Sequence, residues 1–338
     1  MKLPELLRIG CVRLVPMESA RPWPAGGSAR RAPLRRELVL LGALCVFALV
    51  LLVAAPGFFA PGNLRSLFLD NLPLFLAATG MTIVIVAGEI DVSIGALFAA
   101  AGVVAGVLAS LGLPMALVVP LVLLLGAGYG ACQGLLVARG VPAVVVTLAS
   151  LAVLRGCLRW STGGRWIGNL PDGFQWFGLG QNGGQLLFAA VTLALMALTA
   201  AALRWLHAGR AVYAVGCDEN AARLAGIRTG LVKVAVFASM GAFASAAAIL
   251  SAARYPAIEI EAGAGLELQA IACVVLGGAS IKGGRGTLLG TALGVVLFGA
   301  LGTALVFLHV GATWERAIQG AIILAAVAPE AWRSARHA

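Results

Sequence analysis

Charged residues are scarce in this chain of 338 residues. They make up 11% of the sequence, against about 25% in a typical soluble protein, while hydrophobic residues reach 61%. A soluble protein needs more polar surface than this to cover its core. The composition therefore excludes soluble enzymes and soluble nucleic-acid-binding proteins. It predicts an all-α polytopic membrane protein.

The sequence also lacks the motifs of several site types. It contains no Gly-x-x-x-x-Gly-Lys-Ser/Thr run, so it has no Walker A loop for nucleotide phosphates. Its three histidines stand far apart, and its six cysteines show no paired spacing, so no metal site is expected. No nucleophile–base pair suggests a membrane-embedded enzyme.

Apolar runs near the length of a bilayer crossing, about 20 residues, are frequent in the chain. They predict about ten transmembrane helices in two weakly related halves. The run 266–281 is the weakest and could be a broken helix. The ten runs are 38–55, 67–87, 92–111, 114–138, 142–160, 184–205, 231–253, 266–281, 287–308 and 312–329.

The distribution of cations predicts the orientation. With a cytoplasmic N-terminus, 18 Lys and Arg residues fall inside and three outside, which is the bias expected of a membrane protein with both termini cytoplasmic. Arg8 and Arg13 interrupt the first apolar stretch, so it is not a signal peptide, and Met17 is an alternative start. The predicted parts are a basic disordered N-terminus (1–37), a membrane domain (38–329) with a cytoplasmic loop (206–230), and a cytoplasmic tail (330–338).

Two glycine-rich motifs, Gly88 to Gly95 and Gly277 to Gly286, each follow an apolar run that ends on the cytoplasmic side. In the first, Asp91 is expected to cap the following helix at the cytoplasmic interface. In the second, the glycines favour close helix packing over phosphate binding, because Gly286, Gly290 and Gly294 recur every four residues. The two motifs together suggest a parallel repeat. Their candidate structural residues are Gly88, Asp91, Ser93, Gly95, Gly277, Gly278, Gly283, Gly284 and Gly286.

The internal loop carries a short helical pattern. Asp218 supplies an acidic start, and Gly226 supplies a stop in the left-handed conformation. So short a helix is marginal in water, so it should persist only when packed against its own chain or a partner.

Three motifs in this order resemble a known family. Gly88 to Gly95 is similar to the pattern Gly-Gly-Ile-Asp-Leu-Ser-Val-Gly. Gly216 to Ile227 is similar to the pattern Gly-Gly-Asn-x-x-Ala-Ala-Arg-x-x-Gly-Ile. Gly263 to Ser280 is similar to the pattern Gly-x-Gly-x-Glu-Leu-x-x-Ile-Ala-x-x-Val-x-Gly-Gly-x-Ser. Pro142 to Leu148 and Arg155-Gly156 add further matches. The chain thus resembles permease subunits of bacterial ABC sugar importers, in the branch that serves ribose, rhamnose and autoinducer-2.

The resemblance implies a division of labour. This chain would be a permease in the bacterial inner membrane with no ATPase of its own, and ATP and Mg would bind a partner ATPase in the cytoplasm. A second permease chain, the same or related, and a periplasmic solute-binding protein would complete the importer in the lipid bilayer. No nucleic acid and no cofactor on this chain are implied. The implied ATPase-coupling residues are Asp218, Glu219, Asn220, Ala222, Arg223, Leu224 and Gly226.

The implied cargo is a neutral, monosaccharide-like solute. Features around Thr162–Pro171 and Arg254-Tyr255 favour the rhamnose or autoinducer-2 type, with ribose next. Polar residues within the spans could line its path, although each also suits a hydrogen bond within or between helices. They are Asn71, Thr79, Thr82, Gln133, Thr147, Ser150 and Gln269.

The sequence departs from the family pattern at three positions. Glu89 stands where the pattern has a second glycine, Cys217 replaces a common glycine, and Gln269 stands where sugar permeases often carry Asp. An alternative of another class also remains open at this point, namely an ion-coupled secondary transporter that uses Glu89, Asp91 or Glu267.

Overall fold

The computed structural model describes residues 31–310 together with 314, 317–318, 320–321 and 324. This part of the chain is helical, apart from loops, two 3-10 turns (Pro56–Phe59 and Gln175–Gly178) and an isolated antiparallel bridge between Ile167 and Ile258. The helices are α1 (Arg31–Ala54), α2 (Pro61–Val86), α3 (Ile94–Ser110), α4 (Met115–Ala138), α5 (Ala143–Thr162), α6 (Gly180–Trp205), α7 (His207–Cys217), α8 (Glu219–Leu224), α9 (Thr229–Ala252), α10 (Leu266–Leu276) and α11 (Leu288–Phe307).

The all-α membrane architecture is confirmed. Seven helices are long and apolar enough to cross a bilayer, namely α1, α2, α4, α5, α6, α9 and α11. Two shorter apolar helices, α3 and α10, coincide with two further expected spans. The tenth expected span, 312–329, lies largely outside the described residues, as do the tail 330–338, Met17 and residues 1–30. The expectation of disorder is wrong for 31–37, which form the start of α1.

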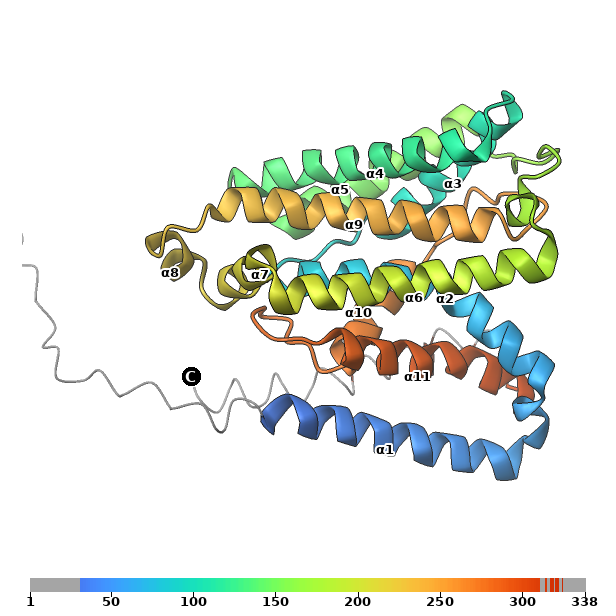
Figure 1. Cartoon of the computed structure of the whole chain (residues 1–338), viewed down its shortest axis with the longest axis horizontal. Coiled ribbons are helices and arrows are strands. Elements are labelled where there is room, and N and C mark those ends of the chain that lie inside the picture. The colour runs from blue at the N-terminus through green and yellow to red at the C-terminus, as the bar shows by residue number, and fades with distance from the viewer. Residues whose placement is uncertain (1–30, 311–313, 315–316, 319, 322–323, 325–338) are drawn as a thin grey trace, which may run out of the picture.

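Helix α2 is the centre of the bundle. Its apolar segment is 83% buried, whereas that of α1 is 11% buried. It packs against α6, α9, α10 and α11, and Figure 1 shows it enclosed among these elements. An apolar helix side that is exposed in this fold can face lipid, whereas an apolar helix that is buried on most sides packs against other helices. The high burial of α2 therefore makes it the central helix of the bundle.

Helices α4 and α9 form the closest helix pair, because glycines let their backbones meet. Gly126, Gly130 and Gly134 lie four residues apart on one face of α4. A Cβ at Gly130 would collide with the Phe237 carbonyl oxygen, and one at Gly134 would lie 2.7 Å from the Val234 Cα. This is the small-residue packing that membrane helices use in place of a hydrophobic driving force.

Helices α3 and α10 are shorter than the hydrocarbon core of a membrane is thick. Their 17 and 11 residues rise about 26 and 16 Å, against a hydrocarbon core of about 30 Å. Each follows a full-length helix and a non-helical stretch, 87–93 before α3 and 253–265 before α10. The run 266–281 is therefore a short helix that ends at Leu276 and continues as a loop.

The two interrupted segments run in opposite directions. The chain after α2, at Gly88, meets Gly216 and Gly283, so α2 ends at the same end of the bundle as α7 and the loop after α10. Helix α9 begins at that end and delivers stretch 253–265 to the other (Figure 1). The two glycine-rich motifs do meet at one end, as expected. Helices α2 and α10, which precede the two motifs, both end there, so the two motifs have the same orientation, and the parallel repeat stays a prediction.

The two ends of the bundle differ in what they carry. One end, here the α7–α8 end, bears the helices α7 and α8, and the opposite end, here the 163–179 end, bears the loop between α5 and α6 (Figure 1). Residues 207–217 form a helix where the sequence suggested loop, because Gly209, Val212, Val215 and Gly216 share a buried face.

Candidate functional site

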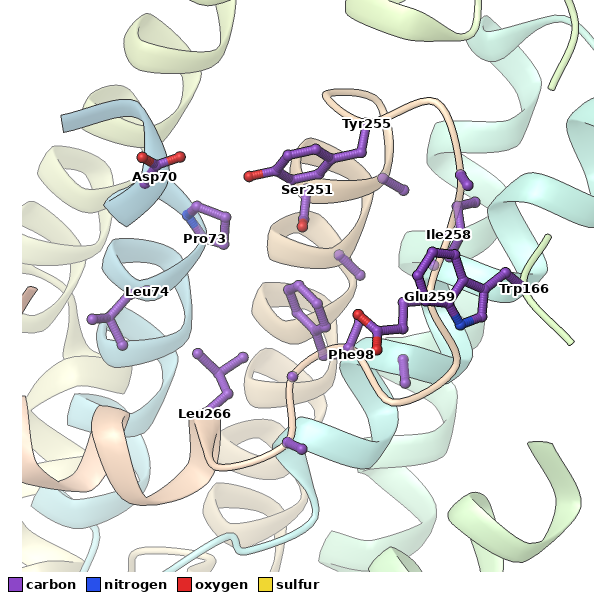
Figure 2. A pocket seen from close by; sticks show the side chains of 18 of the residues that line it. Asp70, Pro73, Leu74, Phe98, Trp166, Ser251, Tyr255, Ile258, Glu259 and Leu266 are labelled. Carbon is purple, nitrogen blue, oxygen red and sulfur yellow. The ribbon is translucent and has the colours of Figure 1, made fainter. Parts of the chain in front are cut away.

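A cavity of about 600 Å³ opens among α2, α3, α9 and the stretch 253–265. This volume is in the range of small-molecule sites, about 300–1,000 Å³. Figure 2 shows Asp70, Pro73 and Leu74 of α2 on one side, and Trp166 and Glu259 on the other. Residues of the 163–179 end thus contribute to its wall.

The cavity combines two aromatic rings with polar groups that lack a free positive charge. Trp166 is 64% exposed and Tyr255 is 49% exposed, so both rings offer surface to a ligand. Asp70 is neutralised by Arg254, whose Nη2 lies 2.6 Å from its Oδ1. The described residues that line the cavity include no Lys or Arg. The cavity therefore suits a neutral ligand with hydroxyl groups better than an anion.

The inner end of the cavity is the meeting point of α3 and α10. Phe98 and Leu266 lie there (Figure 2). A Cβ at Gly95 would collide with the Gly263 carbonyl oxygen and with Oε2 of Glu267, so only glycine allows these two helix starts to meet. Glu267 Oε1 accepts a hydrogen bond from Gly265 N at 3.3 Å, while Oε2 is buried without a hydrogen-bond partner.

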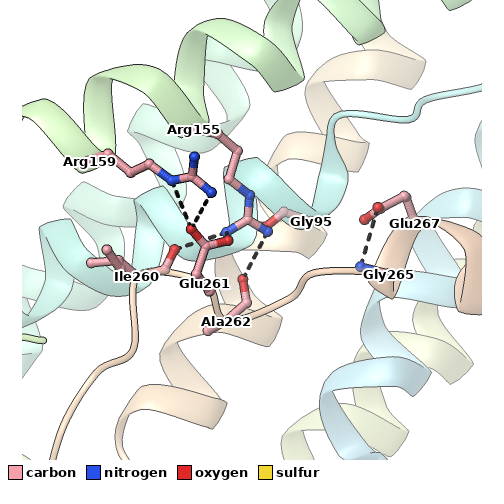
Figure 3. A network of polar contacts seen from close by, with 8 residues as sticks. All are labelled: Gly95, Arg155, Arg159, Ile260, Glu261, Ala262, Gly265 and Glu267. Carbon is pink, nitrogen blue, oxygen red and sulfur yellow. Dashed lines mark hydrogen bonds and ion pairs between the residues drawn. The ribbon is translucent and has the colours of Figure 1, made fainter. Parts of the chain in front are cut away.

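Arg155 of α5 holds the non-helical stretch in place. Its guanidinium donates to the carbonyl oxygens of Ile260 at 2.9 Å, Ala262 at 3.2 Å and Gly95 at 3.3 Å (Figure 3). Its side chain is 15% exposed and also lies 3.8 Å from Glu261. Irregular backbone within a membrane must find its partners inside the protein, and Arg155 supplies them. The signal in the sequence was a cation within an apolar run.

The expected path residues fall into two groups. Asn71 and Gln269 line the cavity. The other five do not line it and are engaged within or between helices. The hydroxyls of Thr79, Thr82 and Thr147 donate to the backbone carbonyl oxygens of Phe75, Ala78 and Val144, respectively. The hydroxyl of Thr82 also lies 2.8 Å from that of Thr291, and the Gln133 amide donates to Ser93 Oγ at 2.8 Å. Ser150 forms a hydrogen bond with Tyr129.

Asp91 is not the helix cap that the sequence suggested. Helix α3 begins at Ile94 with Ser93 as its N-cap residue. Asp91 Oδ1 accepts from the Ser93 backbone N at 2.8 Å and from Ser93 Oγ at 2.7 Å, and Asp91 is only 1% exposed. It therefore shapes the stretch before α3 from inside the protein, rather than sitting at an interface.

Helix α8 forms as the local sequence predicts. Asp218 Oδ1 accepts from the backbone N of Asn220 at 2.9 Å and of Ala221 at 3.0 Å, which caps the helix. Gly226 has a φ of +83°, the left-handed stop that was expected.

Helix α8 has an exposed face and a face that is buried against its own chain. Leu224 is 91% exposed, and Asp218, Asn220, Arg223 and Gly226 are also exposed. Ala222 is 4% exposed, so it supports the helix from within and cannot offer surface to a partner. Leu224, not Ala222, is the apolar side chain available for docking.

The α7–α8 end is joined to the bundle by backbone contacts between glycines. A Cβ at Gly216 would collide with the Val86 carbonyl oxygen, and one at Gly283 would lie 2.7 Å from the Gly88 Cα. Gly284 N donates to Val86 O at 2.9 Å, and Tyr213 Oη donates to Gly286 O at 2.7 Å. Gly277 likewise meets Gly290, and Gly278 follows with a φ of +88°. These are close packing contacts, although Gly286 lies before α11, which begins at Leu288, and so does not share a helix face with Gly290 and Gly294.

Charged residues add a second connection at this end. Lys233 Nζ lies 2.9 Å from Glu89 Oε1 and 2.9 Å from Glu219 Oε2, and Arg223 lies 3.4 Å from Glu219 Oε1. The hydrogen bond from Lys233 lowers the pKa of Glu219 below its ordinary value. No pattern in the sequence predicted that Lys233 would join these segments.

Comparisons with known proteins agree on the family. The family model described as branched-chain amino acid transport system / permease component matches residues 63–327. The ribose import permease protein of Escherichia coli K12 is 35% identical over 294 residues, which cover 84% of this chain and 90% of that protein. The autoinducer 2 import system permease protein of Yersinia enterocolitica is 34% identical over 297 residues, covering 86% of this chain and 81% of that protein. No solved structure matches. With a family match over most of its length and a helical, multi-pass membrane architecture, the chain belongs to this family of transport permeases.

Proposed function

We propose that this chain is the permease subunit of an ATP-driven importer for a small, neutral, hydroxyl-rich solute. The cavity carries the proposal, because it combines two exposed aromatic rings, two amides and two carboxylates, and its described lining includes no Lys or Arg. Aromatic rings pack against the C–H faces of such solutes, while amides and carboxylates bond their hydroxyls. Relatives named for ribose and autoinducer 2 import support this class of solute.

The proposal includes an orientation and partners. The α7–α8 end would face the cytoplasm, because the cation-rich loops belong to it, and both termini would then be cytoplasmic in a bacterial inner membrane. Helix α8 would dock a separate ATPase that binds ATP and Mg. The 163–179 end would receive the solute from a periplasmic binding protein, beside a second permease chain.

Ion coupling is not supported. The two relatives named above are permeases of import systems. The three carboxylates that an ion-coupled transporter would use each have a structural role in this chain. Glu89 pairs with Lys233, Asp91 accepts from Ser93, and Glu267 accepts from Gly265 at the start of its own helix.

The energy source is tested by uptake of labelled ribose, rhamnose and autoinducer 2 in cells that produce the permease with its ATPase and binding protein. We expect vanadate to abolish uptake and a protonophore to leave its initial rate unchanged. Uptake that resists vanadate and collapses with the protonophore would contradict the proposal.

The cavity is tested by two variants with a matched control. Gln269→Ala and Tyr255→Ala should each lower uptake at low solute concentration about tenfold, since a lost hydrogen bond is worth about 1.4 kcal/mol. Trp160→Ala is the control, because Trp160 is 87% exposed and lies outside the cavity. If all three variants transport at the normal rate, the solute does not contact this cavity.

A further inference from the structure

We propose that Lys233 is a positioning residue for transport, and that it couples the position of helix α8 to the position of the non-helical stretch before α3. The proposal rests on the proposed function, in which α8 docks the ATPase. It concerns a contact among three segments far apart in sequence, joined by one ammonium group.

Lys233 is placed to act on both segments at once. Its Nζ lies 2.9 Å from a carboxylate oxygen of Glu219, the first residue of α8, and 2.9 Å from one of Glu89. The Lys233 side chain is 12% exposed and that of Glu89 is 16% exposed. Exposed ion pairs contribute little because water screens them, but a pair shielded to this degree is held in a defined geometry.

Glu89 is the point at which this connection enters the membrane domain. It follows Gly88 directly after α2, and five residues later α3 begins at Ile94. Those residues span at most about 18 Å when extended. They end beside Gly95, which meets the start of α10 at the inner end of the cavity and whose carbonyl oxygen accepts from Arg155. This short segment therefore connects Glu89 to the cavity.

The charges in the cluster are balanced. Lys233 and Arg223 face Glu89 and Glu219, giving two positive and two negative groups. Arg223 contacts only the more exposed carboxylate at 3.4 Å, so it cannot replace Lys233 at Glu89. Removing the Lys233 charge would leave two carboxylates near each other and would disconnect α8 from Glu89.

The connection is separate from the glycine contacts. Those hold α7 to the end of α2 through backbone atoms, whereas Lys233 reaches α8, the docking helix, through a side chain. Glu89 also stands where the family pattern has glycine, which cannot form an ion pair. The ion pair thus depends on a residue at which this chain departs from the family pattern, and in the proposal its role is to tighten coupling.

The test measures solute transported per ATP hydrolysed, in proteoliposomes that contain the permease, its ATPase and its binding protein. Lys233→Met should still co-purify with the ATPase, because Leu224 and Asn220 are unchanged, and should hydrolyse ATP. We expect its transport per ATP to fall at least fivefold, and Lys233→Arg to restore most of it. Arg210→Met, an exposed change on α7, is the matched control and should keep the normal ratio.

A double-mutant comparison separates coupling from general damage. Glu89→Gln should lower the ratio as well, and the double variant should be no worse than the more impaired single variant, because both remove one contact. If Lys233→Met does not accumulate, Glu89→Gln alone gives the same readout. A normal ratio in the variants overturns the role of Lys233. Absence of ATP-driven uptake in the unaltered protein overturns the proposed function instead.

Discussion

The two ends of the bundle are built differently. At the α7–α8 end, glycine backbones of α7, the stretch after α2 and the loop after α10 touch directly, with Gly216 against the Val86 carbonyl. At the 163–179 end, non-helical backbone is held by a side chain, Arg155, and leaves a cavity. Backbone contacts leave little room for adjustment, whereas a guanidinium can re-form its bonds. The comparison indicates a more rigid α7–α8 end, where we propose that the ATPase docks, and a more adaptable 163–179 end, where we propose that the solute binds.

The largest effect is expected at the rigid end. Gly216→Val puts a side chain where the Val86 carbonyl oxygen and, at 2.7 Å, the Gly284 N already lie. Overpacking costs about 1–3 kcal/mol and more where backbone must move, so we expect loss of folded permease from the membrane. Gly128→Val is the control, since a Cβ there meets nothing within 4 Å. Equal membrane abundance of the two variants would show that the glycine contact is not tight.

The next effect concerns Arg155. Arg155→Met leaves three backbone carbonyls of buried or half-buried residues without their donor, and each such loss costs about 1–3 kcal/mol. We expect a lower melting temperature in detergent and faster proteolysis at 253–265. Arg159→Met, which removes a side chain that is 66% exposed, should change neither. Similar behaviour of both variants would mean that Arg155 does not hold the stretch.

A smaller effect on the fold, but a large one on assembly, is expected at α8. Leu224→Asp should leave the melting temperature of the permease unchanged, because Leu224 is 91% exposed, and should abolish co-purification with the ATPase. Ala222→Asp should instead destabilise the permease itself, because Ala222 is buried in its own chain. Retained ATPase binding by Leu224→Asp would place docking elsewhere.

The sequence predicted those features of this molecule that depend on residues close together in the chain. The helix α8 was predicted with its cap and its stop, because Asp218 and Gly226 act on neighbouring backbone. Nine of the ten apolar runs became helices for a similar reason. The gaps before α3 and α10 fall between predicted runs, but the early end of α10 at Leu276 was not located, because hydropathy measures apolar content and is the same for an extended and a helical segment.

The functional contacts were harder to predict because they join distant segments. Arg155 bonds backbone carbonyls, which have no signature in a sequence, and Lys233 joins Glu89 to Glu219, two residues far apart in the chain. Five of the seven polar residues proposed for the path have partners within or between helices, away from the cavity. Trp166 and Tyr255 were known as aromatic residues but only the fold brings them to one cavity.

The smallest effect is a pH dependence at the rigid end. The pKa of Glu219 is lowered by Lys233, so the pair stabilises the fold above the ordinary carboxylate pKa of about 4.3. This contribution is lost as pH falls through the lowered pKa. The difference in melting temperature between the permease and Glu219→Gln should therefore be constant from pH 5 to 8 and shrink as the pH falls below about 4. A difference that does not shrink at acidic pH would contradict the ion pair.

The orientation of the two ends is the central claim, and labelling in intact cells tests it most directly. In a background without the native cysteines, an impermeant maleimide should label Trp166→Cys from outside, and added solute with binding protein should slow that labelling. Leu224→Cys, at a position that is 91% exposed, should react only in inside-out vesicles. Labelling of residue 224 from outside, with residue 166 protected until the membrane is inverted, would contradict the account.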